Sequence, residues 1–400
     1  MTRSDRPSPL FAQRRLARCH SIADLRRAAR RRLPRAAFDY ADGGAEDEVT
    51  LARNESAFDA YALLPRTLVD VSEVDLSTQV LGQTCALPLV LAPTGLTRLF
   101  HHEGEHAVAR AARSAGVPYT LSSLSTTSIE DLAAAVPGPH WFQVYVWRDR
   151  GLVREFFARC RASGYSTLCL TVDTPTLGQR ERDLHNGMTI PPRLTLGALA
   201  DAALRPAWCW KFLTTRRIRF ENVRGAGDAD AGDLTTLWGY ITEQFDASLD
   251  WDDLAWMVQE WNGPFAIKGV LRGEDAVRAA ALGVRAVIVS NHGGRQLDHA
   301  AAALDVLPEI AAAVGDRAEL ILDGGVRRGT DVLKALALGA RACMIGRPYL
   351  YGLGAGGEAG VSRALDLLRA ELRRALMLIG APSVRALEPG FVRRSAAHPA

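Results

Sequence analysis

The chain has 400 residues, of which 48% are hydrophobic and 23% charged, and its formal net charge is +3. This mild charge, without a basic tract rich in stacking aromatic residues, argues against a nucleic-acid partner. The six cysteines are scattered with no spacing typical of zinc, so we expect no metal site and a reducing cytoplasm. No signal-peptide pattern is found, and no apolar run approaches the ~20 residues that cross a bilayer.

The N-terminal region is expected to hold a tail and two helices. Residues 1–20 lack periodicity, which predicts a frayed tail. Ser21 can cap a helix that stops at Pro34, where the proline ring ends the hydrogen-bond ladder. A second helix is expected from Arg35 to Gly43. Residues 66–87 then read as short strands that could close the bottom of a barrel.

From Leu87 onward, short apolar runs alternate with helical stretches, which is the pattern of a parallel α/β sheet. Residues 174–263 are too long for one crossover, so we expect a long insertion or lid after the fourth strand. The last helix, residues 362–380, is expected to pack on the barrel or on a neighbouring subunit. The other expected helices cover residues 103–116, 128–136, 153–164, 274–283 and 330–339.

Nearly every apolar run ends in a residue able to do chemistry. Polar side chains at the carboxyl ends of successive strands are what a (β/α)8 barrel uses to build one active site. We therefore predict an α/β fold, a (β/α)8 TIM barrel in one domain over residues 21–390, with N-terminal helices and a C-terminal tail at 391–400. The residues at the run ends are Thr94, Ser122, Gln143, Asp173, Lys268, His292, Asp323 and Arg347.

Two glycine-rich turns favour a phosphate site. DGGVRRG (323–329) and IGRP (345–348) follow the last two predicted strands. In such barrels the loops after these strands often bind phosphate through backbone N–H groups. Each turn alone is as well explained as an ordinary βα turn. Together with the guanidinium fork of Arg347, they predict that this end of the barrel binds a phosphate.

A second set of residues favours proton removal from a small acid. His292 lies three residues before Arg295, and Asp173 could orient one nitrogen of its ring. Arg180 and Arg295 could hold a carboxylate by bidentate bonds. The alternative is a group of surface ion pairs.

Lys268 ends an otherwise buried run, where a cation needs an anionic partner or a functional reason. No G-x-G-x-x-G lies between a strand and a helix, so a nicotinamide dinucleotide is disfavoured. One phosphate site, one cation and several polar contacts are instead what flavin mononucleotide (FMN) requires.

The sequence resembles the FMN-dependent L-2-hydroxy acid oxidases and dehydrogenases, which include glycolate oxidase, lactate oxidase, bacterial L-lactate dehydrogenase and (S)-mandelate dehydrogenase. The resemblance runs from about Leu33 to Leu387. Its motifs are FDYADGGAED, FQVY, LTVDTP, RERDLHN, SNHGGRQLD and LDGGVRRGTDVLKALALGA. It implies an FMN enzyme that oxidises an L-2-hydroxy acid to the 2-oxo acid.

The resemblance also implies a role for each matching residue. His292 would be the active-site base, with Asp173 hydrogen-bonded to it. The residues that would bind the substrate are Tyr40, Leu124, Tyr145, Arg180 and Arg295. The residues that would bind FMN are Pro93, Thr94, Gly95, Ser122, Gln143, Thr171, Lys268, Asp323, Gly325, Arg327, Gly346 and Arg347.

Departures from the pattern inform the subtype. Gly95 replaces the alanine of plant-type oxidases, and Leu124 replaces the tryptophan of glycolate oxidases. Leu124 favours a lactate- or mandelate-like substrate, and Gly95, together with the long basic insertion, favours a quinone or other carrier as electron acceptor. The alternatives are an oxygen-using hydroxy acid oxidase, an FMN enzyme of secondary metabolism acting on a less common hydroxy acid, and a flavin-binding protein without catalysis.

Residues 202–220 mix arginine, lysine and aromatic residues with no acidic residue. Such a segment can lie at a membrane surface, and the matching insertion of related dehydrogenases is associated with membrane binding. A lid or a subunit contact explains the pattern equally. We expect a cytoplasmic enzyme, peripheral on the inner face of the cell membrane if this segment binds lipid. The resemblance also implies a homo-oligomer, commonly a tetramer.

Overall fold

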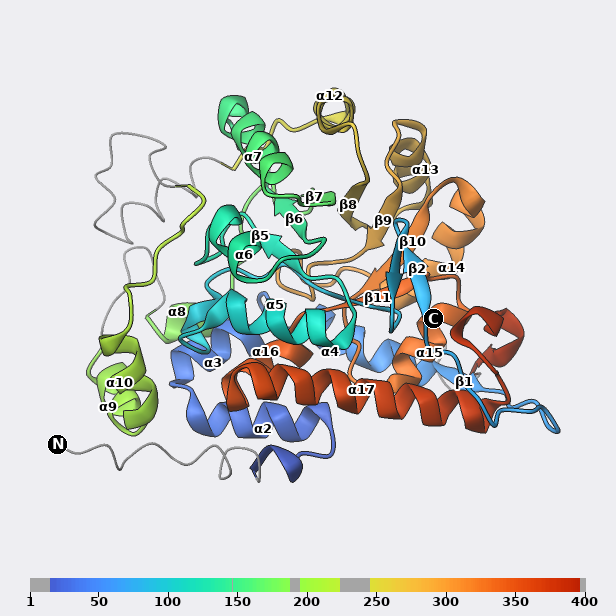
Figure 1. The fold of residues 1–400 in the computed structure, drawn as a ribbon, viewed down its shortest axis with the longest axis horizontal. Helices are drawn as coiled ribbons and strands as arrows, with labels where there is room; N and C mark the ends of the chain where they lie inside the picture. Colours follow the sequence, from blue (N-terminus) through green and yellow to red (C-terminus); the bar gives the residue numbers. More distant parts are fainter. Residues whose placement is uncertain (1–14, 146, 188–194, 224–244, 396–400) are drawn as a thin grey trace.

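The computed structural model describes residues 15–145, 147–187, 195–223 and 245–395 of the chain. Its central sheet has eight strands in the order β4-β11-β10-β9-β8-β7-β6-β5, and every pairing between them is parallel. A further bridge joins Leu91 of β4 to Tyr119, just before β5, and brings the two edges together. The sheet is thus a nearly closed barrel, and the predicted TIM barrel is confirmed (Figure 1).

The barrel strands are short and almost wholly buried. Parallel strands covered by helices outside and side chains inside must be apolar on both faces, as in β9, whose four residues are all buried. The strands are β4 (Leu89–Leu91), β5 (Thr120–Ser122), β6 (Trp141–Val144), β7 (Thr167–Thr171), β8 (Phe265–Val270), β9 (Ala286–Val289), β10 (Glu319–Asp323) and β11 (Ala342–Ile345).

Helices alternate with these strands around the barrel. The five that the sequence predicts between strands are present as α5 (Gly104–Ala115), α6 (Ile129–Ala135), α7 (Arg150–Ala162), α13 (Gly273–Ala281) and α15 (Gly329–Ala337). Three more complete the set: α12 (Trp251–Trp261), α14 (Ala303–Val314) and α16 (Arg347–Gly356). Because α12 comes directly before β8, the end of the long insertion is regular barrel structure.

A hairpin closes one end of the barrel, as predicted. It consists of β2 (Thr78–Val80) and β3 (Gln83–Cys85). Val80 and Leu81 belong to the same buried apolar cluster as Ile288 of β9. The backbone N–H of Leu81 also donates to Glu319 at the start of β10. The hairpin therefore covers the amino ends of the strands and leaves the carboxyl ends as the open mouth.

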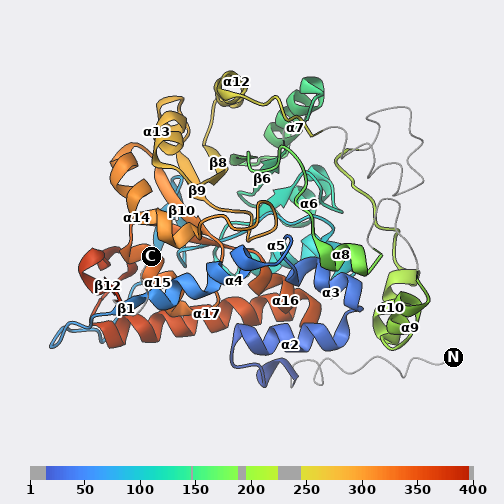
Figure 2. The same ribbon diagram turned by 180° about the vertical axis from the view of Figure 1, so that it is seen from behind.

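The N-terminal helices α2 (Ile22–Arg32), α3 (Arg35–Asp42) and α4 (Val49–Ser56) precede the barrel. Ser21 caps α2, since its hydroxyl accepts the Asp24 N–H. Helix α2 lies along α17 (Glu358–Ile379), the long final helix, in both ribbon views (Figures 1 and 2). Helix α17 also packs on α5, α15 and α16, so it covers the barrel of its own chain.

The chain is ordered closer to its ends than the sequence suggests. Leu16 and Cys19 are buried, and the Cys19 carbonyl accepts two bonds from Arg363, so residues 15–20 are not a frayed tail. Near the other end, β12 (Val392–Arg394) pairs with β1 (Tyr61–Leu63), so the tail predicted from 391 was wrong there too. The rest of both predicted tails, 1–14 and 396–400, lies outside the described residues.

The insertion after β7 contains α8 (Glu181–His185), α9 (Leu196–Ala203) and α10 (Pro206–Thr214), and residues 188–194 and 224–244 of it lie outside the described ranges. Helices α9 and α10 lie together at one side of the barrel (Figure 1). Trp208 of α10 donates its indole N–H to the Leu99 carbonyl, which ties the insertion to the barrel. Among the described residues, no helix has both the length and the apolar character that a membrane span needs.

Candidate active site

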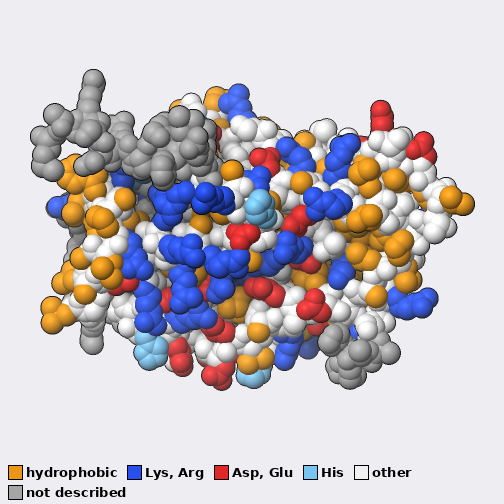
Figure 3. Space-filling view, turned by 90° about the horizontal axis from the view of Figure 1, so that it is seen from below, with side chains coloured by type: hydrophobic (Ala, Val, Ile, Leu, Met, Phe, Trp, Pro, Cys, Tyr) orange, Lys and Arg blue, Asp and Glu red, His pale blue; other side chains and the backbone are white. Residues whose placement is uncertain are grey.

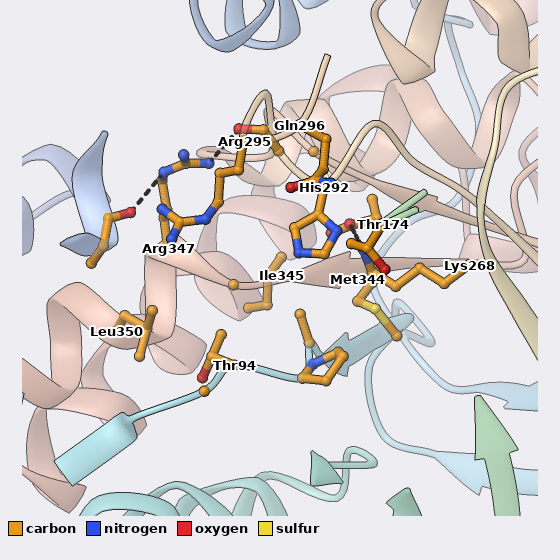
Figure 4. A pocket seen from close by; sticks show the side chains of 18 of the residues that line it. Thr94, Thr174, Lys268, His292, Arg295, Gln296, Met344, Ile345, Arg347 and Leu350 are labelled. Carbon is orange, nitrogen blue, oxygen red and sulfur yellow. Dashed lines mark hydrogen bonds and ion pairs between the residues drawn. The ribbon is translucent and has the colours of Figure 1, made fainter. Parts of the chain in front are cut away.

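A cavity opens at the carboxyl ends of the strands, where the sequence places the chemistry. Figure 4 shows Arg295 and Arg347 on the opposite side of His292 from Lys268. The predicted residues that line it are Tyr40, Pro93, Thr94, Gly95, Leu124, Tyr145, Arg180, Lys268, His292, Arg295, Asp323, Gly325, Arg327, Gly346 and Arg347. The other four, Ser122, Gln143, Thr171 and Asp173, do not line it: Asp173 is bonded to His292, and the rest are buried at the ends of β5, β6 and β7.

His292 and Asp173 form a half-buried pair. His292 Nδ1 lies 2.9 Å from Asp173 Oδ1, and the backbone N–H of His292 donates to the Ser290 hydroxyl. The φ of His292 is 59°, a left-handed value that is uncommon outside glycine and often found where a side chain is held for function. Gln296 helps to hold Asp173 in place, because its side-chain amide donates to the Asp173 backbone carbonyl.

The electrostatics of this pair keep the imidazole neutral. Burial lowers the pKa of His292 below its ordinary 6.5. The Asp173 carboxylate raises this pKa and the Lys268 charge lowers it, and the net shift is downward. Burial works to raise the pKa of Asp173, but the His292 ring and the Lys268 charge hold it below its usual range. A neutral ring that donates through Nδ1 to a carboxylate has a free lone pair on Nε2. The pair can therefore accept a proton.

Two guanidinium groups share one wall of the cavity. Arg295 donates to the carbonyls of Tyr40 and Gly43, and no described carboxylate forms an ion pair with it. Arg180 lies 3.5 Å from Asp183. The guanidinium carbons lie 5.1 and 5.8 Å from the Tyr40 ring centroid. Burial and the charge of Arg180 lower the pKa of Arg295 to about 10, so this wall favours an anion.

Close backbone packing brings the two arginines together. A Cβ at Gly178 would lie 2.3 Å from the Arg295 carbonyl oxygen, so only glycine allows the loop after β7 to approach the loop after β9 this closely. The Gly178 N–H donates to the side chain of Gln296. Tyr40 comes from α3, whose last residue, Asp42, accepts a hydrogen bond from Tyr351.

Apolar and aromatic side chains line another part of the cavity. Phe245 lies edge-to-face with Tyr145 at 5.3 Å between ring centroids, and Leu124 lies close to Gly95. Burial raises the pKa of Tyr145 to about 12, so its hydroxyl stays a donor. Sequence reasoning missed Phe245, because it lies inside the insertion and ends no barrel strand. It also missed Thr174 and Gln296, which line the cavity beside predicted residues.

Lys268 is held by acceptors on neighbouring strands. Its ammonium lies 3.0 Å from both Asp323 and the Ser290 hydroxyl, and Ser290 donates to Asp323 at 2.7 Å. Burial alone would lower the pKa of Lys268, but the Asp323 and Asp173 carboxylates outweigh it and hold the pKa above its ordinary value. The cation at this point of the cavity is therefore permanent.

The donors around the cavity fit FMN. Gln143 Nε2 and Thr171 Oγ1 are buried and have no hydrogen-bond partner among the described residues, and such atoms at a strand end are explained by a polar ligand. Gly324 and Gly325 adopt positive φ after β10, and Gly346 precedes α16. These turns offer backbone N–H groups for a phosphate. The guanidinium of Arg347 is placed there by the carbonyls of Ala41, Gly43 and Gly293.

Comparison with known proteins agrees with this chemistry. Residues 29–394 match the family described as FMN-dependent dehydrogenase. The chain is 48% identical to an L-lactate dehydrogenase of Caulobacter vibrioides over 92% of this chain and 96% of the relative. It is 45% identical to an L-lactate oxidase of Nostoc sp. over 98% of this chain and 100% of the relative.

Among solved structures, the monotopic membrane protein (S)-mandelate dehydrogenase superposes with a TM-score of 0.91 at 39% identity, covering 94% of this chain and 100% of that one. The chain therefore belongs to the FMN-dependent dehydrogenase family and is an oxidoreductase that oxidises a 2-hydroxy acid with FMN as its cofactor.

Proposed function

We propose that the protein oxidises an L-2-hydroxy acid of the lactate or mandelate type to the 2-oxo acid and passes the electrons to a quinone or another carrier. The observation that carries the proposal is the placement of the neutral His292 ring, bonded to the Asp173 carboxylate, in the same cavity as the Arg180–Arg295 wall. Relatives named for lactate and a structural neighbour named for mandelate support the substrate class.

Arg180 and Arg295 would bind the substrate carboxylate. Charge-assisted bonds to an anion relieve the repulsion that lowers the pKa of Arg295. Tyr40, beneath both guanidinium groups, would limit their movement. Two fixed cations on one wall orient the acid, so that only one enantiomer places its hydroxyl toward His292.

His292 would accept a proton through Nε2, either from the substrate hydroxyl or from the α-carbon. Asp173, at 2.9 Å from the ring, would stabilise the imidazolium that forms. FMN, when bound, supplies the acceptor for the two electrons removed from the substrate. The permanent charge of Lys268 would favour negative charge that develops nearby.

The FMN-binding residues form two groups. Arg327, Arg347, Gly325 and Gly346 would hold the phosphate, with Asp323 near the ribityl chain. The residues that would surround the flavin ring are Pro93, Thr94, Gly95, Ser122, Gln143, Thr171 and Lys268. The unpartnered Gln143 amide and Thr171 hydroxyl support this assignment.

The side chain of the substrate would lie against Leu124, Tyr145 and Phe245. This apolar wall favours a methyl or phenyl group over the hydrogen of glycolate. An anaerobic screen tests the assignment: lactate and mandelate should bleach the bound flavin faster than glycolate. A preference for glycolate would refute it.

The choice of acceptor and location rests on α9 and α10. These helices expose a group of large apolar side chains: Leu196, Leu199, Leu204, Trp210, Phe212 and Leu213. An exposed apolar group of this size suits a membrane surface, and one structural neighbour is a monotopic membrane protein. We infer peripheral binding on the inner face of the cell membrane, where a quinone is available.

The second candidate is an oxygen-using oxidase, which the oxidase relative favours. Turnover with a quinone analogue should exceed turnover with oxygen, and an oxygen rate as fast as the quinone rate would support the oxidase instead. We also expect a homotetramer, which light scattering of the purified protein would test.

A further inference from the structure

A second cavity, separate from the candidate active site, lies between α2, the loop before α5, and α10. Its volume is about 400 Å³, within the range of small-molecule sites, roughly 300–1,000 Å³. Figure 3 shows the face that α2 lies on: Lys and Arg side chains crowd its middle, and hydrophobic side chains lie at the end where Figure 1 places α9 and α10.

The lining of this cavity is strongly basic. Among the described residues, no acidic side chain lines it, and its charged side chains are Arg15, Arg31, Arg32, Arg98, Arg205, Lys211 and Arg216. Of these, Arg205 pairs with Asp201 and Arg216 with Glu221. Arg98 donates to backbone carbonyls. Within the described part of the chain, the other four form no ion pair with a carboxylate.

Two further observations favour an anionic acceptor in this cavity. Arg205 Nε is buried and has no hydrogen-bond partner, which calls for an acceptor that the described residues do not provide. Burial lowers the pKa of Arg32, and the nearby Arg15 lowers it further. Like charges placed this close are costly unless an anion joins them.

The charge also decides between an anion and a metal ion. His101, His102 and Glu103 have ligand atoms within 4.8 Å of one another, as a metal site would. Burial lowers the pKa of His102, and Lys211 lowers it further. The basic side chains that line the cavity would repel a divalent cation. The surroundings therefore select an anion.

Part of the lining is apolar. Leu33, Phe100 and Ile218 are buried, and Trp208 stacks on Phe212 with 4.7 Å between ring centroids. Inorganic phosphate alone would leave this surface unused. The combination of several cations with a stacked aromatic pair suits a multiply charged group that carries an apolar body.

The second cavity is distinct from the first, but residues that line the two cavities are in contact. Phe100 lines the second cavity and stacks on Tyr40 of the first at 6.3 Å. The segment after β4 lines the first cavity through Thr94 and Gly95 and the second through Arg98 and His101. No residue in the described ranges lines both cavities.

We propose that this cavity is a binding site for a phosphate ester with an apolar body, held by Arg32, Arg98 and Lys211 and packed against Trp208. The phosphate group can belong to a soluble metabolite or to the headgroup of an anionic lipid. The site goes beyond the oxidation chemistry, because none of these residues lines the first cavity.

Calorimetry with the FMN-loaded enzyme at fixed ionic strength tests the proposal. The probes are phenyl phosphate, dihexanoyl phosphatidylglycerol below its micelle concentration, and the uncharged dihexanoylglycerol. Both phosphate compounds should bind and the uncharged one should not. Tighter binding of phenyl phosphate assigns the site to a soluble ester, and tighter binding of the phosphatidylglycerol assigns it to a lipid headgroup.

The double variant Arg32→Gln with Lys211→Gln should weaken phosphate binding at least ~10-fold, since bonds to charged groups are removed. The matched control is Arg30→Gln with Arg217→Gln, which makes the same charge change next to the cavity without touching it. Equal weakening in both variants, or no phosphate binding to the wild type, would overturn the proposal. Anaerobic flavin reduction, measured on the same samples, should stay at the wild-type rate and so separates this outcome from a failure of the proposed catalysis.

Discussion

Replacing Asp173 with asparagine isolates one term of the proposed chemistry, the stabilisation of a protonated His292. The change removes a negative charge 2.9 Å from the ring nitrogen and keeps the shape of the side chain. At an effective dielectric constant of ~20, that charge attracts an imidazolium by about 6 kcal/mol at this distance. Each ~1.4 kcal/mol is tenfold in rate, so the full loss would be about 10⁴-fold.

Part of this loss is recovered, because the asparagine oxygen can still accept the Nδ1–H bond. We therefore expect Asp173→Asn to slow flavin reduction between ~10² and ~10⁴-fold. The dissociation constant of the substrate should change less than ~3-fold, since the arginine wall is untouched and most affinity comes from its charge-assisted bonds.

Anaerobic stopped-flow absorbance separates the two quantities, because the limiting rate and the half-saturating concentration are read from one titration. The bound FMN is counted from its absorbance before mixing, which excludes loss of cofactor as the cause. A limiting rate within tenfold of the wild type would refute the role given to Asp173. A large change in affinity at an unchanged rate would place it in substrate binding instead.

The remaining predictions concern the same cavity. His292→Gln should reduce the rate of flavin reduction by roughly 10²–10⁴-fold while FMN stays bound; retention of more than a tenth of the rate would contradict the assignment. Because the pKa of His292 lies below 6.5 and only the neutral ring accepts a proton, the rate should be level near neutral pH and fall as pH drops below that value. A rate that already falls on acidification above neutrality would show that another group titrates. Arg295→Met should weaken substrate binding ~10- to 100-fold, the worth of a charge-assisted bond, seen as a raised KM, and an unchanged KM would remove Arg295 from the carboxylate site. Lys268→Met leaves Asp323 buried without its cation, so we expect the apoprotein to lose about 3–5 kcal/mol of stability in a denaturant titration, whereas an unchanged midpoint would contradict a stabilising role for this ion pair.

The sequence predicts the barrel well because each strand combines an apolar run with a chemically active end. His292 and Asp173 are 119 residues apart along the chain, yet their contact could be anticipated. Both follow barrel strands, and strand ends meet at one mouth. For the same reason, the sequence predicts that Arg295 and Lys268 lie at this mouth.

The features that the sequence does not predict are those whose local sequence signals are weak or contradictory. Helix α14 contains Pro308, and α16 contains several glycines, so neither has a clean helical pattern, although packing in the barrel stabilises both. Phe245 is placed by a bridge to Trp147, a long-range contact with no local signature. The burial of Leu16 is of the same kind, since it depends on the neighbouring Gly356.

Anaerobic titration of the FMN-loaded enzyme with the two enantiomers of mandelate, in the wild type and in Arg295→Met, tests the central claim most directly. The account predicts stoichiometric loss of flavin absorbance with the L-series enantiomer alone, and a marked loss of that response at the same concentration in the variant. Equal bleaching by both enantiomers, or bleaching that is indifferent to Arg295, would contradict it.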